Sequence, residues 1–362
     1  MGWMNDAREN SNRLFARWNE VVKTSGELVA VRDGGRAWTF AELAEEVQAL
    51  PVVEGEEICC VSGSGVKFVV DVLCAWRDGK VVWPQDSVAR TEDGATPVLD
   101  LPDEVVHLKS TSGSTGAAKV VMFTADALMA DAAQIVELME MRQERVNLAA
   151  ISLAHSYGFS NLVLPLLLHG IPIRFVDSPL PGAVRDALGS LSAPCTLAAV
   201  PAMWLAWHRA GVLDEFSPMI ATAISAGAPL SLDFEREVFE SCGLKIHNFY
   251  GASECGGIAY DSSSSPRGDA SYVGRRMSAV ALSLGDEGCL EVRGKTVALG
   301  YYDGVGSDAL GGGVFRTSDL VRIDEDDVFL VGRTDDMINV AGRKISPEKI
   351  EAVLKASPLV RE

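Results

Sequence analysis

The sequence predicts an α/β fold with layered α/β subdomains, largely parallel sheets and a small antiparallel, barrel-like subdomain. Two observations predict it. From about residue 105 to residue 249, short β-branched or apolar runs alternate with helical patterns, which is typical of a parallel sheet covered by helices. After Gly256 the pattern changes to short strands separated by Gly and Asp turns. That change indicates antiparallel hairpins.

The alternating part contains three strand candidates, which are the apolar runs 105–108, 196–200 and 220–224. Between the first two, Thr124 is placed to cap a helix. Apolar residues then recur at helical spacing, namely Leu128, Ala132, Ile135, Val136 and Met139. We interpret this stripe as the core-facing side of a helix.

Towards the end of the chain, residues 321–323 and 328–331 flank an acidic turn and predict a hairpin. The Ser-rich segment 261–269 is predicted to be a loop. Ser346, followed by Pro347, is placed to cap a last helix.

We predict one large unit and the beginning of another. The large unit covers residues 1–332 and divides into subdomains at about 1–104, 105–255 and 256–332. A last unit begins near Arg333, and its thirty residues (362 − 332) are too few for an independent globular domain.

Composition excludes several classes of protein. The formal net charge of −18 argues against a nucleic-acid binder and against broad docking on acidic lipid. The seven cysteines include no CxxC pair, so reduced thiols and a cytoplasmic location are expected. The most apolar stretch, 162–175, is interrupted by Pro, His and Gly and is a poor membrane span.

A loop rich in small hydroxyl residues follows the first strand candidate and runs from Ser110 to Lys119. Successive small residues let backbone N–H groups converge on an anion, and the lysine adds a point charge. The spacing is not that of a Walker loop, because two alanines separate Lys119 from Gly116 and Val120 follows the lysine. A P-loop NTPase is therefore disfavoured, and the loop alone fits a phosphate site or a solvated turn equally well.

Five segments in fixed order give the sequence a resemblance to a known family. They are Thr111–Lys119, Ser225–Leu230, Tyr250–Glu254, Phe315–Leu320, and Gly332–Asp336 continuing through Gly342 to Glu351. Together they resemble the motifs of the adenylate-forming superfamily, which comprises acyl- and aryl-CoA synthetases, luciferases and peptide-synthetase adenylation domains. The resemblance covers nearly the whole chain and is most specific from Ser110 onward.

The resemblance implies an ATP site with Mg²⁺. Tyr250 would stack on adenine, Ser253 would bond the α-phosphate, Glu254 would hold Mg²⁺, and Asp319 would accept the ribose hydroxyls with help from Arg333. The phosphate loop would comprise Thr111, Ser112, Gly113, Ser114, Thr115, Gly116 and Lys119, and the adenine side Ser225, Ala226, Gly227 and Gly251. If the order of the five motifs is set aside, the better interpretation of Tyr250 is a half-buried core aromatic, that of Glu254 a solvated acid and that of Asp319 a turn cap.

The resemblance also bears on the acid substrate and the reaction. His155 matches a histidine that acyl- and aryl-activating relatives carry beside the acid pocket, and together with Lys119 and Glu254 it is our catalytic candidate. Amino-acid-activating relatives place an aspartate near here, and none occurs between Leu153 and Leu162. We therefore expect an uncharged acyl or aryl acid, activated to an acyl-adenylate with release of pyrophosphate and then passed to the thiol of CoA or of a carrier protein's phosphopantetheine.

Two hypotheses remain open. Relatives have a mobile C-terminal domain that supplies a lysine and whose hinge lies where Asp335 stands. The resemblance therefore implies that residues 333–362 are a hinge and the first fragment of a truncated C-terminal domain. The lysine has no counterpart in this sequence, so either the sequence was cut, or the natural protein is short, or another chain supplies the lysine. The chain is thus either an acid–thiol ligase, whole or truncated, or a catalytically impaired module that binds nucleotide or acyl-adenylate. The intact Lys119, Glu254, Asp319 and Arg333 favour the ligase, whereas the early stop favours the module.

Overall fold

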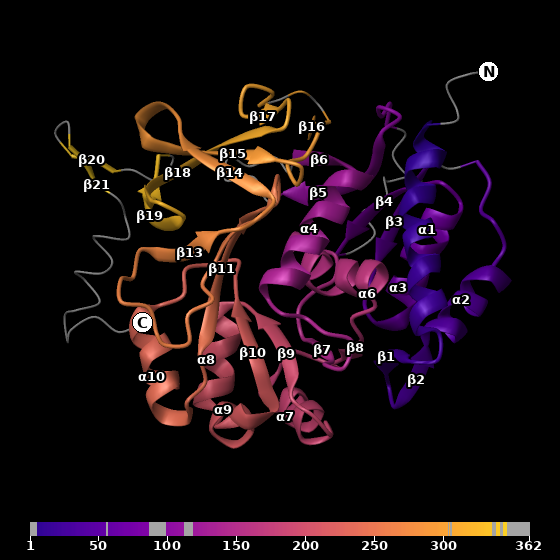
Figure 1. Ribbon diagram of the computed structural model, residues 1–362, viewed down its shortest axis with the longest axis horizontal. Coiled ribbons are helices and arrows are strands. Elements are labelled where there is room, and N and C mark those ends of the chain that lie inside the picture. Colours follow the sequence, from indigo (N-terminus) through magenta and orange to yellow (C-terminus); the bar gives the residue numbers. More distant parts are fainter. Residues whose placement is uncertain are drawn as a thin grey trace.

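The computed structural model describes residues 6–55, 57–86, 99–111, 119–302, 304, 306–334, 338–340 and 343–345. Residues 112–116 of the phosphate loop, the hinge residue Asp335 and the helix expected after Ser346 lie outside these ranges. The described strands form a fourteen-stranded sheet, a five-stranded sheet and a two-stranded sheet. Figure 1 shows the five-stranded sheet beside one flank of the large sheet, with helices between them.

The five-stranded sheet combines a parallel and an antiparallel half. Its order is β16-β6-β5-β4-β3, in which β3, β4 and β5 are parallel while β6 is antiparallel to β5 and to β16. The strands are β3 (Ile58–Ser62), β4 (Val81–Gln85), β5 (Val105–Thr111), β6 (Lys119–Thr124) and β16 (Gly300–Tyr301). The first strand candidate is confirmed as β5.

One half of the large sheet is parallel. Its order is β11-β10-β9-β7-β8-β1, with β2 antiparallel at the edge. The other two strand candidates are confirmed as β9 and β10. The strands are β1 (Val29–Asp33), β2 (Arg36–Thr39), β7 (Asn147–Ala149), β8 (Ile173–Phe175), β9 (Cys195–Ala199), β10 (Ile220–Ser225) and β11 (Ile246–Ala252).

The other half of the large sheet is antiparallel. β11 pairs with β12 antiparallel, so the hairpin-rich part continues the parallel sheet and the large sheet is mixed. The predicted hairpin is confirmed as β18 and β19, joined by a short turn. These strands are β12 (Gly256–Tyr260), β13 (Tyr272–Arg276), β14 (Val280–Leu284), β15 (Cys289–Gly294), β17 (Leu310–Gly311), β18 (Val314–Asp324) and β19 (Asp327–Arg333); β20 (Ile338–Val340) and β21 (Arg343–Ile345) form the separate pair.

The helices form two groups. Near the five-stranded sheet, α1 packs against α3, α4 and α6, whereas α7 to α10 gather beside β9 and β10 at the bottom of the view (Figure 1). The α-helices are α1 (Asp6–Ser25), α2 (Phe40–Ala49), α3 (Gly65–Arg77), α4 (Ala125–Leu138), α5 (Ser156–Gly158), α6 (Leu164–His169), α7 (Pro181–Gly189), α8 (Pro201–Arg209), α9 (Val212–Phe216) and α10 (Leu232–Cys242). Across the described residues, none of the helices has the length and apolar character that crossing a membrane requires.

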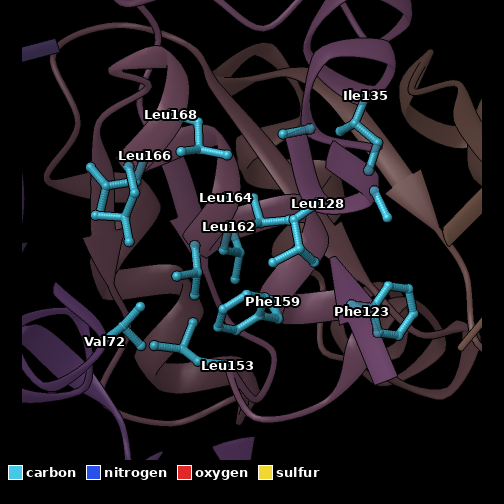
Figure 2. Packing of buried hydrophobic residues seen from close by; sticks show 14 of the residues in the cluster. Val72, Phe123, Leu128, Ile135, Leu153, Phe159, Leu162, Leu164, Leu166 and Leu168 are labelled. Atoms are coloured by element: carbon cyan, nitrogen blue, oxygen red, sulfur yellow. The ribbon is translucent and has the colours of Figure 1, made fainter. Parts of the chain in front are cut away.

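The core confirms the interpretation of the α4 stripe. The side chain of Thr124 accepts a hydrogen bond from the N–H of Ala127, which caps the helix as expected. Leu128, Ala132, Ile135 and Met139 are buried in the main apolar cluster, and Val136 packs against it. Figure 2 shows Leu128 and Ile135 in this cluster together with Phe123 and the leucines around α6.

A buried histidine interrupts this apolar core. His107 of β5 is completely buried, and its ring lies 4.3 Å from the ring centroid of Phe159 and 6.3 Å from that of Phe123. Among the described residues, neither ring nitrogen has a hydrogen-bond partner. Burial, with a smaller contribution from the positive charge of Lys109, holds the pKa of His107 well below its usual value. The imidazole is therefore neutral in the folded protein.

We expect His107 to make the fold sensitive to acid. The unfolded chain protonates this residue near pH 6.5, whereas the folded chain does so only at a lower pH. Its contribution to stability is therefore complete above pH 6.5 and falls as the pH drops towards the folded pKa. Below pH 6.5, this residue should lower the free energy of unfolding by up to about 1.4 kcal/mol for each unit that the pH falls. Replacing His107 by Phe should remove this pH dependence. Unfolding midpoints measured from pH 7.5 to 5 would check this, and parallel profiles for the two proteins would contradict it.

Candidate functional site

A cavity of about 590 Å³ lies at the carboxyl ends of strands from the five-stranded and the fourteen-stranded sheets. Its walls come from the last residues of β4, β5 and β11 and from the residues just after β10. The segment 154–161, which contains α5, forms a further wall. In α/β proteins the carboxyl ends of parallel strands are the usual place for ligands, because loops and helix starts converge there. The topology therefore makes this cavity the candidate active site.

Several residues that the sequence singled out lie around this cavity. Those that line it are Thr111, His155, Ala226, Gly227, Gly251 and Ser253. Ser225, the last residue of β10, is buried just before Ala226. Three of the five motifs thus meet at one cavity, although they lie far apart in the sequence.

Gly251 has a structural reason to be glycine. It faces the paired strand β12, and a Cβ at this position would lie 2.6 Å from the carbonyl oxygen of Gly256. That distance is well inside van der Waals contact, so a larger residue would push β11 and β12 apart. The motif's glycine therefore keeps Tyr250 and Ser253, on either side of it, in place.

Tyr250, Asp319 and Arg333 form one connected group. The Tyr250 hydroxyl donates to Asp319 Oδ2, and Arg333 Nε donates to Asp319 Oδ1 over 2.7 Å. Asp319 and Arg333 face each other in the register of β18 and β19, so the hairpin itself brings the acid and the base together. Burial, and then the charge of Asp319, raise the pKa of Tyr250 well above its usual value, so Tyr250 remains a protonated donor.

The carboxylate of Asp319 keeps capacity for a ligand. It is 5% exposed, and each of its oxygens can accept two hydrogen bonds. Its backbone N–H donates to Thr317 Oγ1 over 3.0 Å, which fixes the strand locally. A buried carboxylate with an arginine on one side can hold a pair of hydroxyl groups such as those of a ribose.

Glu254 and Lys119 are linked by Tyr301, a residue that the sequence analysis did not single out. The Tyr301 hydroxyl donates to Glu254 Oε1 over 3.0 Å, and Lys119 Nζ lies 4.7 Å from the Tyr301 ring centroid. Pairing of β16 with β6 sets Tyr301 opposite Val121, two residues after Lys119. Burial, followed by the charge of Glu254, raises the pKa of Tyr301, so the phenol stays a donor to the carboxylate.

The donor set of Glu254 fits a magnesium ion bound together with a nucleotide. Its second oxygen, Oε2, accepts no hydrogen bond from the residues that the structure describes. Over those same residues there is no cluster of three or more His, Cys, Asp or Glu side chains that could hold a metal alone. Mg²⁺ commonly takes one or two carboxylates and completes its shell with substrate phosphates and water. The available Oε2 of Glu254 matches this mode of coordination.

His155 stands at the exposed part of the cavity wall. Its Nε2 lies 3.0 Å from Asp86 Oδ2, and both side chains are more than half exposed. Ser152 Oγ donates to the other oxygen of Asp86 over 3.0 Å. Ser253, which follows Gly251 by two positions, has its hydroxyl 3.1 Å from that of Ser156. His155 directly precedes α5 and Ser253 contacts its first residue, Ser156, so both lie on the same wall.

Comparison with known proteins agrees with this architecture. The family model described as AMP-binding enzyme matches residues 62–302. The chain is 28% identical to the 2,3-dihydroxybenzoate-AMP ligase of Bacillus subtilis over 75% of its own length and 54% of the relative's. It is also 28% identical to the 2-hydroxy-7-methoxy-5-methyl-1-naphthoate–CoA ligase of Streptomyces carzinostaticus over 91% of its length and 62% of the relative's.

A solved structure shares the fold. ATP-bound MatB from Rhodopseudomonas palustris superposes with a TM-score of 0.81 at 21% identity, covering 96% of this chain and 84% of that one. The chain spans little more than half the length of the first sequence relatives that it matches. Since the family model covers most of the chain, and the motifs and the fold agree with it, the protein belongs to the AMP-binding enzymes of the adenylate-forming superfamily.

Proposed function

We propose that this chain activates a carboxylic acid with ATP, forming an acyl-adenylate and pyrophosphate, and that the acyl group then passes to a CoA or carrier-protein thiol. One observation carries the proposal. Three motifs line a single cavity, and Tyr250, next to the cavity residue Gly251, joins them to the other two motifs through Asp319 and Arg333. These contacts between described residues of the five motifs support one connected site.

The acid is proposed to be an uncharged acyl or aryl acid, and the sequence relatives favour an aryl acid. Both reported relatives are named as ligases of hydroxylated aromatic acids. The cavity wall contains the aromatic side chains of Trp83, Tyr157 and Phe249, which suit a flat apolar ring. Asp86, the one acidic side chain among the described residues that line the cavity, faces His155.

The chemistry needs positioning more than proton transfer. A carboxylic acid is already ionised at neutral pH, so its oxygen can attack the α-phosphorus without a general base. As the new O–P bond forms, the bond from the α-phosphorus to the leaving pyrophosphate breaks, and negative charge builds on that leaving group. We assign its neutralisation to Lys119 and to the Mg²⁺ that Glu254 would hold, which supplies electrostatic stabilisation when bound.

Other residues would hold the reactants. Tyr250 and Asp319 would bind the nucleoside, Ser253 the α-phosphate, and His155 would sit beside the acid.

We propose residues 1–332 as the AMP-binding unit, with Asp335 as the hinge to the following segment. We propose a cytoplasmic location, since the seven cysteines include no CxxC pair and do not form a recognisable disulfide framework.

The test is acid-dependent exchange of labelled pyrophosphate into ATP, measured with Mg²⁺ and a panel of benzoates and alkanoates. Exchange should depend on the acid, and Glu254→Ala should lower it at least about 100-fold because the metal's carboxylate is lost. Glu240→Ala, which removes an exposed carboxylate of α10, is the control and should keep full exchange.

The result also separates the two hypotheses. If no acid supports exchange while an acyl-adenylate analogue binds in calorimetry, the chain is a binding module without turnover. If neither exchange nor analogue binding occurs, the proposed site is wrong.

A further inference from the structure

A short segment, residues 298–301, contacts the main chain on both sides of the proposed phosphate and metal site. The N–H of Ala298 donates to the carbonyl oxygen of Glu254 over 2.9 Å. The segment ends in β16, which pairs antiparallel with β6, and β6 begins at Lys119. The same few residues therefore fix the backbone beside the proposed metal carboxylate and close to the proposed phosphate lysine.

Tyr301, the last residue of this segment, also contacts both side chains. Its hydroxyl donates to Glu254 Oε1 over 3.0 Å, and Lys119 Nζ lies over its ring, 4.7 Å from the centroid. An ammonium group at this distance is attracted by the negative face of an aromatic ring. Tyr301 is 7% exposed, so water takes little part in either contact. Two opposite charges are thus held by two different parts of one side chain.

Lys119 and Glu254 do not contact each other directly. Within the described part of the chain, no carboxylate oxygen lies within ion-pair distance of Lys119 Nζ. Opposite charges held this close in a partly buried site attract each other. A direct contact would occupy the donors of the lysine and the oxygens of the glutamate, which a nucleotide and its metal need. The phenol engages each group separately instead.

Gly306 leaves room for the lysine against the ring. Its φ is +88°, a backbone conformation that favours glycine. A Cβ at this position would lie 3.3 Å from Lys119 Nζ and 3.3 Å from Cε2 of Tyr301. Both distances are tighter than ordinary van der Waals contact, so a side chain here would displace the lysine from the ring. The contact between Lys119 and Tyr301 therefore depends on the local backbone as well as on charge.

We propose that Tyr301 is a positioning residue that keeps Glu254 and Lys119 apart, so that both stay available to a nucleotide bound with Mg²⁺. This inference rests on the proposed function, because it takes Glu254 as the metal carboxylate and Lys119 as the cation for the phosphates. Tyr301 acts only through these two side chains and takes no part in bond making. Groups that hydrogen-bond to a metal ligand set the affinity for the metal, because they fix the ligand's orientation.

The experiment measures how far Mg²⁺ strengthens nucleotide binding. The probe is an ATP analogue with a methylene group in place of the α–β bridging oxygen, which cannot release pyrophosphate. Calorimetry on the whole chain gives its affinity with and without Mg²⁺, and we call the quotient the Mg²⁺ ratio. Tyr301→Phe keeps the ring and the pairing of β16 with β6 but removes the hydroxyl. The Mg²⁺ ratio should fall about tenfold, because Glu254 then turns to Lys119.

A second substitution tests whether separation of the charges is the cause. Lys119→Met removes the charge that Glu254 would otherwise meet. Alone, it should weaken binding of the analogue both with and without Mg²⁺. Added to Tyr301→Phe, it should restore most of the Mg²⁺ ratio, and this coupling is what a double-mutant cycle measures. A merely structural role of Tyr301 predicts no such rescue, because the packing change would remain.

The matched control is the neighbouring tyrosine. The hydroxyl of Tyr302 accepts from the N–H of Asp100 over 3.4 Å, away from Glu254 and Lys119. Tyr302→Phe removes the same atom from the adjacent residue. It should therefore leave the Mg²⁺ ratio unchanged.

The outcomes separate this inference from the proposed reaction. An unchanged Mg²⁺ ratio in Tyr301→Phe, an equal fall in Tyr302→Phe, or no rescue by Lys119→Met would overturn the positioning role. Pyrophosphate exchange with acids, together with an unchanged ratio, would overturn this inference alone. A fall that Lys119→Met rescues, without exchange for any acid, would support the inference and reject catalysis by this chain. If Mg²⁺ does not strengthen binding to the unsubstituted chain, the inference fails together with the assignment of Glu254.

Discussion

Replacing Glu235 by Ala is expected to lower the free energy of unfolding by about 3 to 5 kcal/mol, because it leaves the buried guanidinium of Arg267 without its carboxylate partner and removes one of the two carboxylates that Lys245 contacts. Glu235 of α10 is completely buried. One of its oxygens accepts from Lys245 Nζ, and the other accepts from Arg267 Nε over 2.7 Å. Lys245 also contacts Asp261 over 2.6 Å.

The same network explains how the Ser-rich loop 261–269 is held. Arg267 lies in this loop and donates to the carbonyl oxygens of Leu230 and Tyr272 over 2.7 and 2.8 Å. Asp261 would have a raised pKa from burial alone, but hydrogen bonds from Lys245 and Ser263 hold its pKa below the usual value. Its stabilising contribution is therefore present above the unfolded pKa and is lost as the pH falls through the folded pKa.

Thermal or urea unfolding of the whole chain would measure the effect of Glu235→Ala. The matched control is Glu237→Ala, two residues along the same helix, whose carboxylate is 65% exposed and faces His208 over 3.2 Å. An exposed pair of this kind contributes at most about 1 kcal/mol. Equal losses in the two variants would contradict the role of the buried network.

Replacing Asp319 by Asn is expected to weaken binding of ATP about 10- to 150-fold. The loss corresponds to about 1.5 to 3 kcal/mol, the contribution of a hydrogen bond to a charged group. The amide offers one acceptor oxygen where the carboxylate offers two, and its NH₂ group cannot accept from Arg333 or from the Tyr250 hydroxyl. The nucleoside would therefore compete with these two residues for one oxygen.

Calorimetric titration with ATP, with and without Mg²⁺, would measure this loss. Asp324→Asn is the control on the same strand β18, since that carboxylate is 73% exposed and lies 3.8 Å from Arg322. The loss should be the same without Mg²⁺, because Asp319 is assigned to the ribose and not to the metal. An affinity within twofold of the unsubstituted protein, or a loss seen only with Mg²⁺, would reject that assignment.

Local patterns in the sequence were enough to predict the elements that depend on local chemistry. The three strand candidates, the Thr124 cap and the β18–β19 hairpin follow from periodicity and turn residues, and the structure confirms each of them. The α/β class followed from their alternation. The subdomain boundaries at 104, 255 and 332 and the roles of the site residues stay predictions.

Features that depend on distant pairing could not be predicted in this way. Tyr301 reaches Glu254 and Lys119 only because β16 adds to β6, and a short Gly-Tyr segment carries no signal of that partner. The antiparallel strands join the parallel sheet because β11 pairs on both sides, which no periodicity reveals.

The pairing of β16 with β6 also determines how late in folding the edge of the five-stranded sheet can form. Gly300 and Tyr301 complete a sheet whose other strands end at Thr124, so this edge closes only after a loop of more than 170 residues (300 − 124 = 176) has been brought together. Contacts of such long range form slowly. During synthesis the edge of β6 stays open until that late segment emerges, and a shortened version of the protein should extend beyond Tyr301 if it is to avoid an exposed, aggregation-prone strand.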